Sequence, residues 1–182
     1  HILADGQDVI SDLPPERFDW RQQHGDTAGK LAWRCGLIPG IDEFDPLFFE
    51  ISPREAQTMD PRQRLLLQEA WNALEDAGYG PAQIQRNKMG MFVGVERGDF
   101  TASGEKRLTS EHEGILAARL AYVLNFTGPV MAINTACSSG LVAAHQACQA
   151  LRAGECDTAI AAAVNLMLSP KIFLSAADAG ML

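Results

Sequence analysis

The sequence is poor in basic residues and contains no basic cluster. Its 15 Lys and Arg residues are outnumbered by 23 Asp and Glu residues, and the formal net charge is −8. Surfaces that bind nucleic acids or anionic membranes need basic patches, yet no run of Lys and Arg exceeds two residues here. We therefore expect no nucleic-acid partner. No apolar stretch approaches the roughly 18 residues that a membrane-spanning helix requires, which argues against a membrane span.

Cysteine and secretory features are also scarce. The four cysteines show no CxxC spacing, so neither a zinc site nor a disulfide framework is expected. The first residues lack the basic and apolar regions of a signal peptide and are expected to be an internal boundary. What is present, 47% hydrophobic and 21% charged residues, is the composition of one globular domain. We expect a cytoplasmic protein, because the reducing cytoplasm keeps cysteine thiols out of disulfides and so available for chemistry.

Helical and strand patterns alternate along most of the chain. Asp60 and Pro61 are a capping residue and a proline at the first helical position, and Gly78 is expected to end that helix. The further expected elements are a strand at 89–95, a helix at 111–125, a strand at 129–134, a helix at 141–153 and an almost wholly apolar strand at 158–166. The order predicts the α/β class, with the last strand covered on both faces. Residues 1–50 are expected to be an extended segment that wraps over the core.

A reactive cysteine is predicted where the strand at 129–134 meets the next helix. Cys137 lies in a turn of small residues, TACSSG, and is expected at the end of a central strand and in the first turn of the helix. Backbone N–H groups and the positive end of a helix dipole favour the thiolate, the form that attacks. The same N–H groups can receive an oxyanion. The turn therefore suits a nucleophilic thiol, although a packing role is the commoner one for cysteine.

The other three cysteines lack such a setting. One stripe of the helix at 141–153 is expected to be its apolar, buried face. The stripe consists of Leu141, Ala144, Cys148 and Leu151. Cys148 is therefore interpreted as a packing residue, and Cys35 and Cys156 have no partner motif.

No histidine is an evident base for Cys137. The four histidines are His1, His24, His112 and His145. The first lies at the terminus and the second in a polar loop, so neither has a catalytic context. His145 is about 12 Å further along the same helix and is expected at the surface. For His112 a solvated helix end is favoured over catalysis.

Two long segments resemble one protein family. TACSSG with the following LVAAHQACQALRAGECDTAIAAAVNL is similar to the active-cysteine segment of β-ketoacyl synthases, in particular the ketosynthase domains of modular polyketide synthases. FDPLFFEISPREAQTMDPRQRLLLQEAWNALEDAGY resembles another stretch of that family, and the terminal AGML resembles the segment after its active-site helix. The resemblance covers nearly the whole chain in the family's order. NTACSSG and HEGILAARLAY resemble ketosynthases whose acyltransferase is a separate protein.

The resemblance implies the thiolase-like layered αβαβα fold, of which the chain supplies the first half. Residues 1–182 would be an incomplete ketosynthase domain, with the layered half at 51–182. Cys137 would accept an acyl chain from the phosphopantetheine of an acyl carrier protein, and its N–H would form half of an oxyanion hole. A decarboxylated malonyl-type extender would then attack the thioester. No cofactor would bind directly. The implied partners are the acyl carrier protein, other polyketide synthase domains, and a second copy bound through the strand before Cys137.

The chain departs from the family pattern in three respects. The family's two histidine motifs, HGTGT and NxGH, are absent, so the catalytic histidines would lie beyond Leu182 and the chain alone is expected to be inactive. Gly140 stands where serine is usual, and Asn134 where aspartate is usual. Two alternatives stay open: a non-elongating ketosynthase that only transfers acyl chains or is structural, and a thiolase-like or chain-initiating enzyme that uses coenzyme A thioesters. The resemblance at 44–79 favours a synthase over a thiolase.

Overall fold

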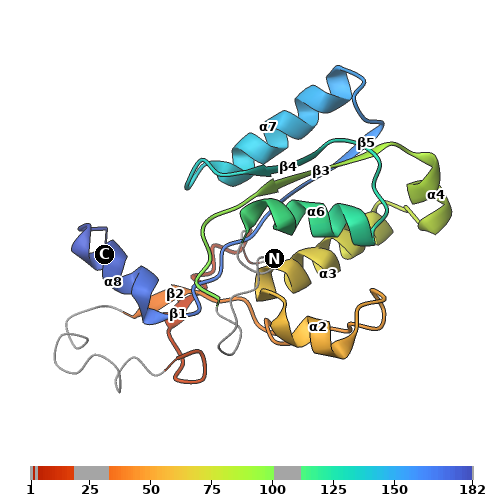
Figure 1. Ribbon diagram of the computed structural model, residues 1–182. Coiled ribbons are helices and arrows are strands. Elements are labelled where there is room, and N and C mark those ends of the chain that lie inside the picture. Colours follow the sequence, from red (N-terminus) through yellow and green to blue (C-terminus); the bar gives the residue numbers. More distant parts are fainter. Residues whose placement is uncertain (1, 3, 19–32, 101–111, 182) are drawn as a thin grey trace. The chain divides into compact units, whose positions relative to one another are not determined.

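The computed structural model describes residues 2, 4–18, 33–100 and 112–181. The chain forms two compact units, one of His1–Ile41 with Met167–Leu182 and one of Asp42–Leu166. The second unit, which carries Cys137, contains the parallel sheet and most of the helices (Figure 1). It begins at Asp42, whereas the sequence predicts the layered half from residue 51.

A short antiparallel ribbon and one helix make up the first unit. β1 (Ile10–Asp12) pairs with β2 (Arg34–Gly36), and the helix is α8 (Pro170–Asp178). Trp33, just before β2, packs against Phe173 of α8 with the ring centroids 5.3 Å apart. Both rings are buried in one apolar cluster. Aromatic packing therefore joins the two ends of the chain in a single unit.

The second unit is built on a three-stranded parallel sheet in the order β4-β3-β5. β3 (Met89–Gly94) is the middle strand, and all six of its residues are buried. β4 (Val130–Ile133) and β5 (Thr158–Ala163) pair with it in parallel, on opposite sides. In this register Phe92 lies opposite residues 131 and 161. The parallel sheet confirms the predicted α/β class.

The strand that leads to Cys137 is an edge strand of this sheet, so the prediction of a central strand is wrong. β4 has β3 on one side only, and Val130 and Met131 are 39% and 40% exposed. β5 is the other edge, and its residues are half-buried or exposed, although an apolar run predicted cover on both faces. Within the described ranges no further strand pairs with β4 or β5, so both strands are edges of the sheet.

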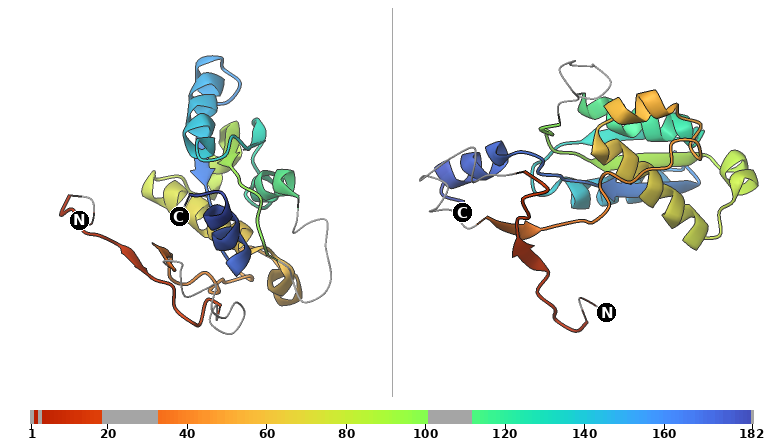
Figure 2. Two further views of the ribbon diagram at one scale, coloured as in Figure 1. Left: turned by 90° about the vertical axis from the view of Figure 1, so that its left-hand side faces the viewer. Right: turned by 90° about the horizontal axis from the view of Figure 1, so that it is seen from below.

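Helices cover both faces of the sheet (Figures 1 and 2). α3 (Pro61–Asp76) and α6 (Glu113–Val123) lie on one face, and α7 (Ser139–Arg152) lies on the other. Side chains alternate across β3, so Met91 joins the core shared with α3 and α6, whereas Phe92 packs with α7. The unit is completed by two short helices, α2 (Pro53–Thr58) and α4 (Pro81–Arg86).

The ends of the long helices follow the sequence signals. The Asp60 side chain accepts the N–H of Arg62 at 2.8 Å, and Pro61 is the first residue of α3. Gly78 and Gly154 follow α3 and α7 with φ of 77° and 71°, the left-handed conformation in which helices commonly end. The predicted end of the helix at Gly78 is confirmed. None of the helices in the described part of the chain is long and apolar enough to cross a membrane.

The buried face of α7 differs from the predicted one. The side chains buried against the sheet are Ala143, Ala147 and Ala150. Leu141 is 81% exposed, Leu151 is 40% exposed and Cys148 is also exposed. The reason is the close approach of the helix to the sheet, since a Cβ on Gly94 of β3 would lie 2.8 Å from the Gly140 nitrogen. Only small side chains fit at that distance, so the larger residues of the predicted stripe lie outside.

Candidate active site

Cys137 lies in the turn between the end of β4 and the start of α7, and it is exposed. α7 begins at Ser139 with Ser138 as its N-cap, so Cys137 comes just before the helix and not in its first turn. The turn is at the carboxyl end of β4. That is the edge of an open parallel sheet at which α/β proteins bind their ligands. The thiol is therefore accessible at the functional edge of the sheet.

The residue before the thiol has a strained backbone. Ala136 has φ of 54°, in the left-handed region, where an alanine is less stable by about 1 to 3 kcal/mol. The amides of Ser138 and Ser139 donate back to the carbonyls of Thr135 and Ala136 at 3.4 Å and 3.0 Å. The chain thus reverses tightly around Cys137, and this conformation has to be held by other contacts.

Ser139 holds the turn from the inside. It is buried, and its Oγ accepts the Thr135 N–H at 2.9 Å and donates to the Ala136 carbonyl at 2.7 Å. The same oxygen is 3.3 Å from the carbonyl oxygen of Val95, just after β3. The Ser138 hydroxyl donates to the Thr135 carbonyl at 2.8 Å. From the sequence both serines were interpreted only as small residues, although serine hydroxyls commonly bond to nearby backbone groups in turns. Ser138, the N-cap of α7, makes no side-chain cap bond.

Asn134 joins the turn to α6. Its Oδ1 accepts the N–H of Ala136 at 3.2 Å. Its Nδ2 lies 3.2 Å and 3.4 Å from the two carboxylate oxygens of Glu113, the first residue of α6. An aspartate at position 134 could make the first hydrogen bond but could not donate the second. The asparagine that departs from the family pattern is therefore matched to a carboxylate of this chain.

The backbone amide of Cys137 has no acceptor among the residues that the structure describes. The neighbouring amides all have acceptors. The Ala136 amide donates to the Asn134 side chain, and the amides of Ser138 and Ser139 donate to carbonyls within the turn. The Cys137 amide itself donates to no residue in the described ranges. An N–H that is open beside its own thiol can bind the oxyanion that forms when the sulfur attacks a carbonyl. In this turn the Cys137 sulfur can attack an acyl carbon while the Cys137 N–H binds the negative charge that develops on the acyl oxygen.

Gly140 lies where α7 packs against β5. A Cβ on this residue would be 3.2 Å from the Cβ of Ala163, closer than ordinary van der Waals contact. The serine that the family pattern predicts here would therefore be a tight fit, and glycine relieves that contact. The helix start can then lie close to the sheet.

The other cysteines differ from Cys137 in burial or in setting. Cys35 and Cys156 are buried, and burial raises the pKa of both thiols. For Cys156 the neighbouring carboxylates raise the pKa further. Such thiols are less often the reactive thiolate. Cys148 is exposed on α7, against the prediction of a packing role, but it belongs to the middle of a regular helix.

The described histidines have no bond to Cys137. His112 is the N-cap of α6, where its Nδ1 accepts the Gly114 N–H at 3.1 Å, so the predicted helix end is confirmed. His145 is exposed on α7 and lies 3.5 Å from Gln149. His1 and His24 lie outside the described residues. Among the residues that the structure describes, no cluster of His, Cys, Asp and Glu is placed to hold a metal ion.

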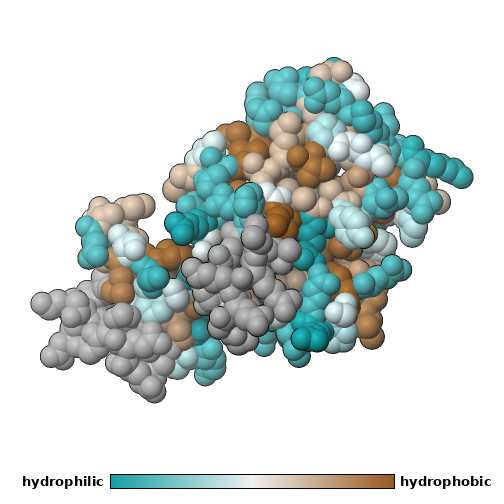
Figure 3. Space-filling view, in the orientation of Figure 1, coloured by the Kyte–Doolittle hydropathy of each residue, from teal (hydrophilic) through white to brown (hydrophobic). Residues whose placement is uncertain are grey.

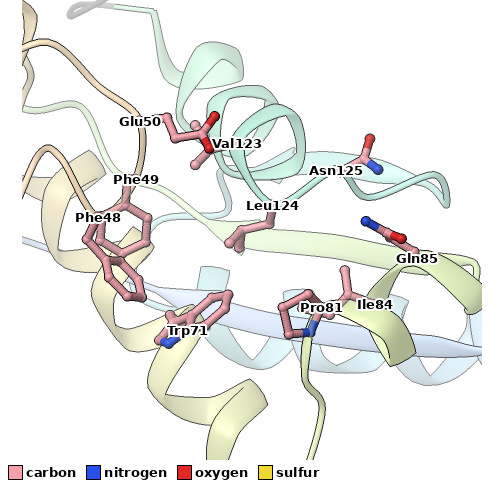
Figure 4. Close-up of a pocket in the computed structure, with 10 residues that line it drawn as sticks. All are labelled: Phe48, Phe49, Glu50, Trp71, Pro81, Ile84, Gln85, Val123, Leu124 and Asn125. Atoms are coloured by element: carbon pink, nitrogen blue, oxygen red, sulfur yellow. The ribbon is translucent and has the colours of Figure 1, made fainter.

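A pocket of about 520 Å³ lies elsewhere in the second unit (Figure 4). Phe48 and Trp71 pack edge to face at one end of it, with their centroids 5.2 Å apart, and Gln85 and Asn125 lie at the other end. Asn125 follows α6 and Gln85 belongs to α4, which precedes β3. The pocket is therefore at the amino-terminal edge of the sheet, opposite the edge that carries Cys137.

The model of the family described as "Beta-ketoacyl synthase, N-terminal domain" matches residues 1–182, the whole chain. The chain belongs to this family. The predicted β-ketoacyl synthase resemblance is thus confirmed, and the thiolase-like α/β fold of ketosynthases is the fold of this chain.

Polyketide synthases and ketosynthase domains are among the relatives of this β-ketoacyl synthase chain. Polyketide synthase ThaG of Burkholderia thailandensis is 59% identical over 153 residues, 83% of this chain and 3% of that protein. Polyketide synthase PksM of Bacillus subtilis is 45% identical over 182 residues, 99% of this chain and 4% of that protein. The solved ketosynthase from module 6 of the bacillaene synthase of Bacillus subtilis matches with a TM-score of 0.86 and 38% identity, covering 100% of this chain and 30% of that chain. An oxazolomycin ketosynthase domain of Streptomyces albus gives a TM-score of 0.89 at 34% identity, covering 98% and 33%.

Proposed function

We propose that the chain is the N-terminal part of a polyketide synthase ketosynthase domain, in which Cys137 accepts an acyl chain. The observation that carries this proposal is the turn itself, where an exposed thiol lies beside its own amide, which donates to none of the described residues. The relatives named as polyketide synthases support the substrate class, which would be acyl thioesters on the phosphopantetheine of an acyl carrier protein. The chain spans only 3–4% of those proteins. We propose the acyl carrier protein and other polyketide synthase domains as its partners.

The first reaction would be a thioester exchange at Cys137. The thiolate sulfur attacks the acyl carbonyl carbon, and the Cys137 N–H donates to the resulting oxyanion. When the tetrahedral intermediate collapses, the bond to the phosphopantetheine sulfur breaks. That thiolate leaves and takes up a proton, and the acyl group stays on Cys137. The exposed position of Cys137 supports this step, because a carrier-bound thioester has to reach the sulfur.

The second reaction would be a decarboxylative condensation in the complete domain. A malonyl-type extender loses carbon dioxide, and the resulting enolate carbon attacks the Cys137 thioester. A carbon–carbon bond forms, and the Cys137 sulfur leaves as thiolate. Two histidines from the HGTGT and NxGH motifs would stabilise the enolate, and neither motif occurs in this chain. A non-elongating ketosynthase, which stops after the first reaction, is the alternative.

Exposed apolar residues support a half-domain with further contacts. Leu141 and Leu151 are exposed on α7, and Val130 and Met131 are partly exposed on the β4 edge. Figure 3 shows apolar side chains over β4, between α6 and α7. We propose that the second half of the domain covers the α7 stripe and that β4 pairs with a second copy in a cytoplasmic homodimer. Sedimentation of the complete domain tests the dimer, and a monomer at micromolar concentration would contradict it.

The acyl-acceptor role is tested by mass spectrometry of the complete ketosynthase domain. Incubated with an acyl thioester of N-acetylcysteamine, a small mimic of phosphopantetheine, the protein should gain the mass of one acyl group. Cys137→Ala should abolish this gain. Cys148→Ala is the matched control, since it removes the other exposed cysteine of the described chain and should leave the gain intact. If Cys137→Ala still gains the acyl mass, the proposal is wrong.

Elongation is tested on the same acylated protein. Malonyl-loaded acyl carrier protein is added, and the carrier is examined for the mass of the β-ketoacyl product. Product formation supports the condensing role. An acyl-Cys137 that persists without product supports the non-elongating alternative instead.

A further inference from the structure

Two side chains connect the Cys137 turn to the start of α6. Asn134 bonds to Ala136 with its oxygen and to Glu113 with its nitrogen. We propose that the Glu113–Asn134 pair is a positioning device that holds Ala136 in its left-handed conformation and thereby sets the reactivity of Cys137. This inference rests on the proposed role of Cys137 as the acyl acceptor.

The hydrogen bonds of Asn134 can be satisfied in one orientation of the amide only. The Ala136 N–H needs an acceptor, and the Glu113 carboxylate needs a donor. An asparagine side chain offers one of each, at opposite ends of the same planar group. The contact to Glu113 therefore fixes the oxygen toward Ala136, at 3.2 Å. Glu113 itself is fixed because it is the first residue of α6, where a negative charge is favoured by the helix dipole.

The hydrogen bond from Asn134 stabilises the strained residue of the turn, Ala136. Ala136 carries the positive φ of the turn and directly precedes Cys137. If the Ala136 N–H loses its acceptor, the backbone can relax toward commoner φ values. The Cys137 amide and its sulfur then move together, because both follow from the same backbone dihedrals. The pair therefore acts on the attacking group and on the oxyanion donor at once.

A carboxylate at position 134 would break the match with Glu113. It has no hydrogen to donate when ionised, and it places a second negative charge within hydrogen-bonding distance of the first. Asn134 is exposed and Glu113 is half-buried, so solvent screens the repulsion and the effect is moderate. A glutamine at position 113 and an aspartate at position 134 again provide one hydrogen-bond donor and one acceptor. The swapped pair thus repairs what the single change disrupts.

The experiment measures alkylation of Cys137 by iodoacetamide in the complete domain. The rate is followed at neutral pH by mass spectrometry of the cysteine peptides. Asn134→Asp should slow labelling of Cys137 about three- to tenfold, since the hydrogen bond to the Glu113 carboxylate is lost and two carboxylates then face each other. Glu113→Ala loses the same hydrogen bond without that repulsion, so it should slow labelling about twofold. The double variant Asn134→Asp with Glu113→Gln should return to within about twofold of the wild-type rate.

Two controls separate positioning from a general loss of structure. The urea concentration at the midpoint of unfolding should stay unchanged in every variant, because the pair is at the surface and holds no core residue. Asn72→Asp repeats the same change in a second exposed asparagine–glutamate pair, with Glu69 at 3.4 Å on α3, and should leave Cys137 labelling unaltered. This pair has no bond to the Cys137 turn.

The outcomes either support or overturn the inference. Slow labelling in Asn134→Asp with recovery in the double variant supports it. An unchanged rate in Asn134→Asp, or a double variant as slow as the single one, overturns it. Alkylation requires no acyl transfer, so these results are independent of whether Cys137 accepts an acyl group. A failed acylation assay with intact rescue of alkylation would contradict the proposed function and leave the positioning role standing.

Discussion

Gly94→Ala is the substitution that we expect to disturb the Cys137 turn through packing alone. Gly94 is the last residue of β3. A Cβ there would lie 2.8 Å from the Gly140 nitrogen and 2.8 Å from the Ser139 carbonyl carbon. Both are backbone atoms, so no side-chain rotation relieves the overlap. The start of α7 has to move, and the Cys137 turn moves with it.

The size of the effect follows from that distance. To reach the 3.4 Å of ordinary van der Waals contact, the helix start has to withdraw from β3 by about 0.6 Å. Inserting a methyl group into a well-packed interface costs about 1 to 3 kcal/mol. We expect the upper part of this range, about 2 to 3 kcal/mol, because the obstacle is backbone on both sides. A misplacement of 1 Å can lower a rate about 100-fold, so acylation of Cys137 should fall about tenfold.

Urea denaturation and the acylation assay measure the two effects in the complete domain. Gly36→Ala is the matched control, because its added Cβ would meet only the Ile10 side chain, at 3.8 Å. The free energy of unfolding should change by less than about 0.5 kcal/mol in this control. If Gly94→Ala unfolds at the wild-type urea concentration and acylates at the wild-type rate, the packing argument is refuted.

Two further predictions concern buried ionisable groups. Arg62 and Asp60 form a buried ion pair at 2.7 Å, so Arg62→Met should lower the free energy of unfolding by about 3 to 5 kcal/mol. Arg34 is in an exposed pair, so Arg34→Met should lower it by less than about 1 kcal/mol. Equal losses in urea denaturation would contradict this prediction. Burial raises the pKa of Cys35 and Cys156, so the unfolded chain loses these thiol protons first as pH rises. Stability should therefore fall as the pH rises through and above the ordinary thiol pKa of about 8.5, with a steeper slope in the wild type than in Cys156→Ala. Equal slopes would argue against the raised pKa.

Local signals made much of the fold predictable. Asp60 with Pro61 begins α3, and Gly78 and Gly154 end α3 and α7, because caps, proline and left-handed glycine act within one helical turn. The position of Cys137 between a strand and a helix was predicted for the same reason. The short helix α2 was missed although the signal was present, since Ser52 and the glutamate three residues later have the spacing of a capping box and Ser52 accepts that N–H at 3.2 Å.

The predictions that failed depended on contacts between distant segments. The apolar stripe that includes Leu141 was expected to be buried, but Gly94 brings α7 so close to β3 that only alanines fit between them. Strand order likewise depends on which strands pair, and the composition of residues 129–134 says nothing about that. The contact of Asn134 with Glu113 joins the end of β4 to the start of α6, so no local pattern could have indicated it.

The anchoring of the turn explains why Cys137, and not Cys148, which is also exposed, is the candidate nucleophile. On one side Ser139 ties the turn to the end of β3, near Val95, and on the other side Asn134 ties it to α6. These bonds use the polar groups around Cys137 and leave its own amide without a described acceptor. An amide in the middle of α7 is used by the helix, so a thiol there has no free donor beside it. The proposed reactivity of Cys137 would therefore derive from a backbone held from two sides, and a variant that loosens either side should slow the labelling of Cys137.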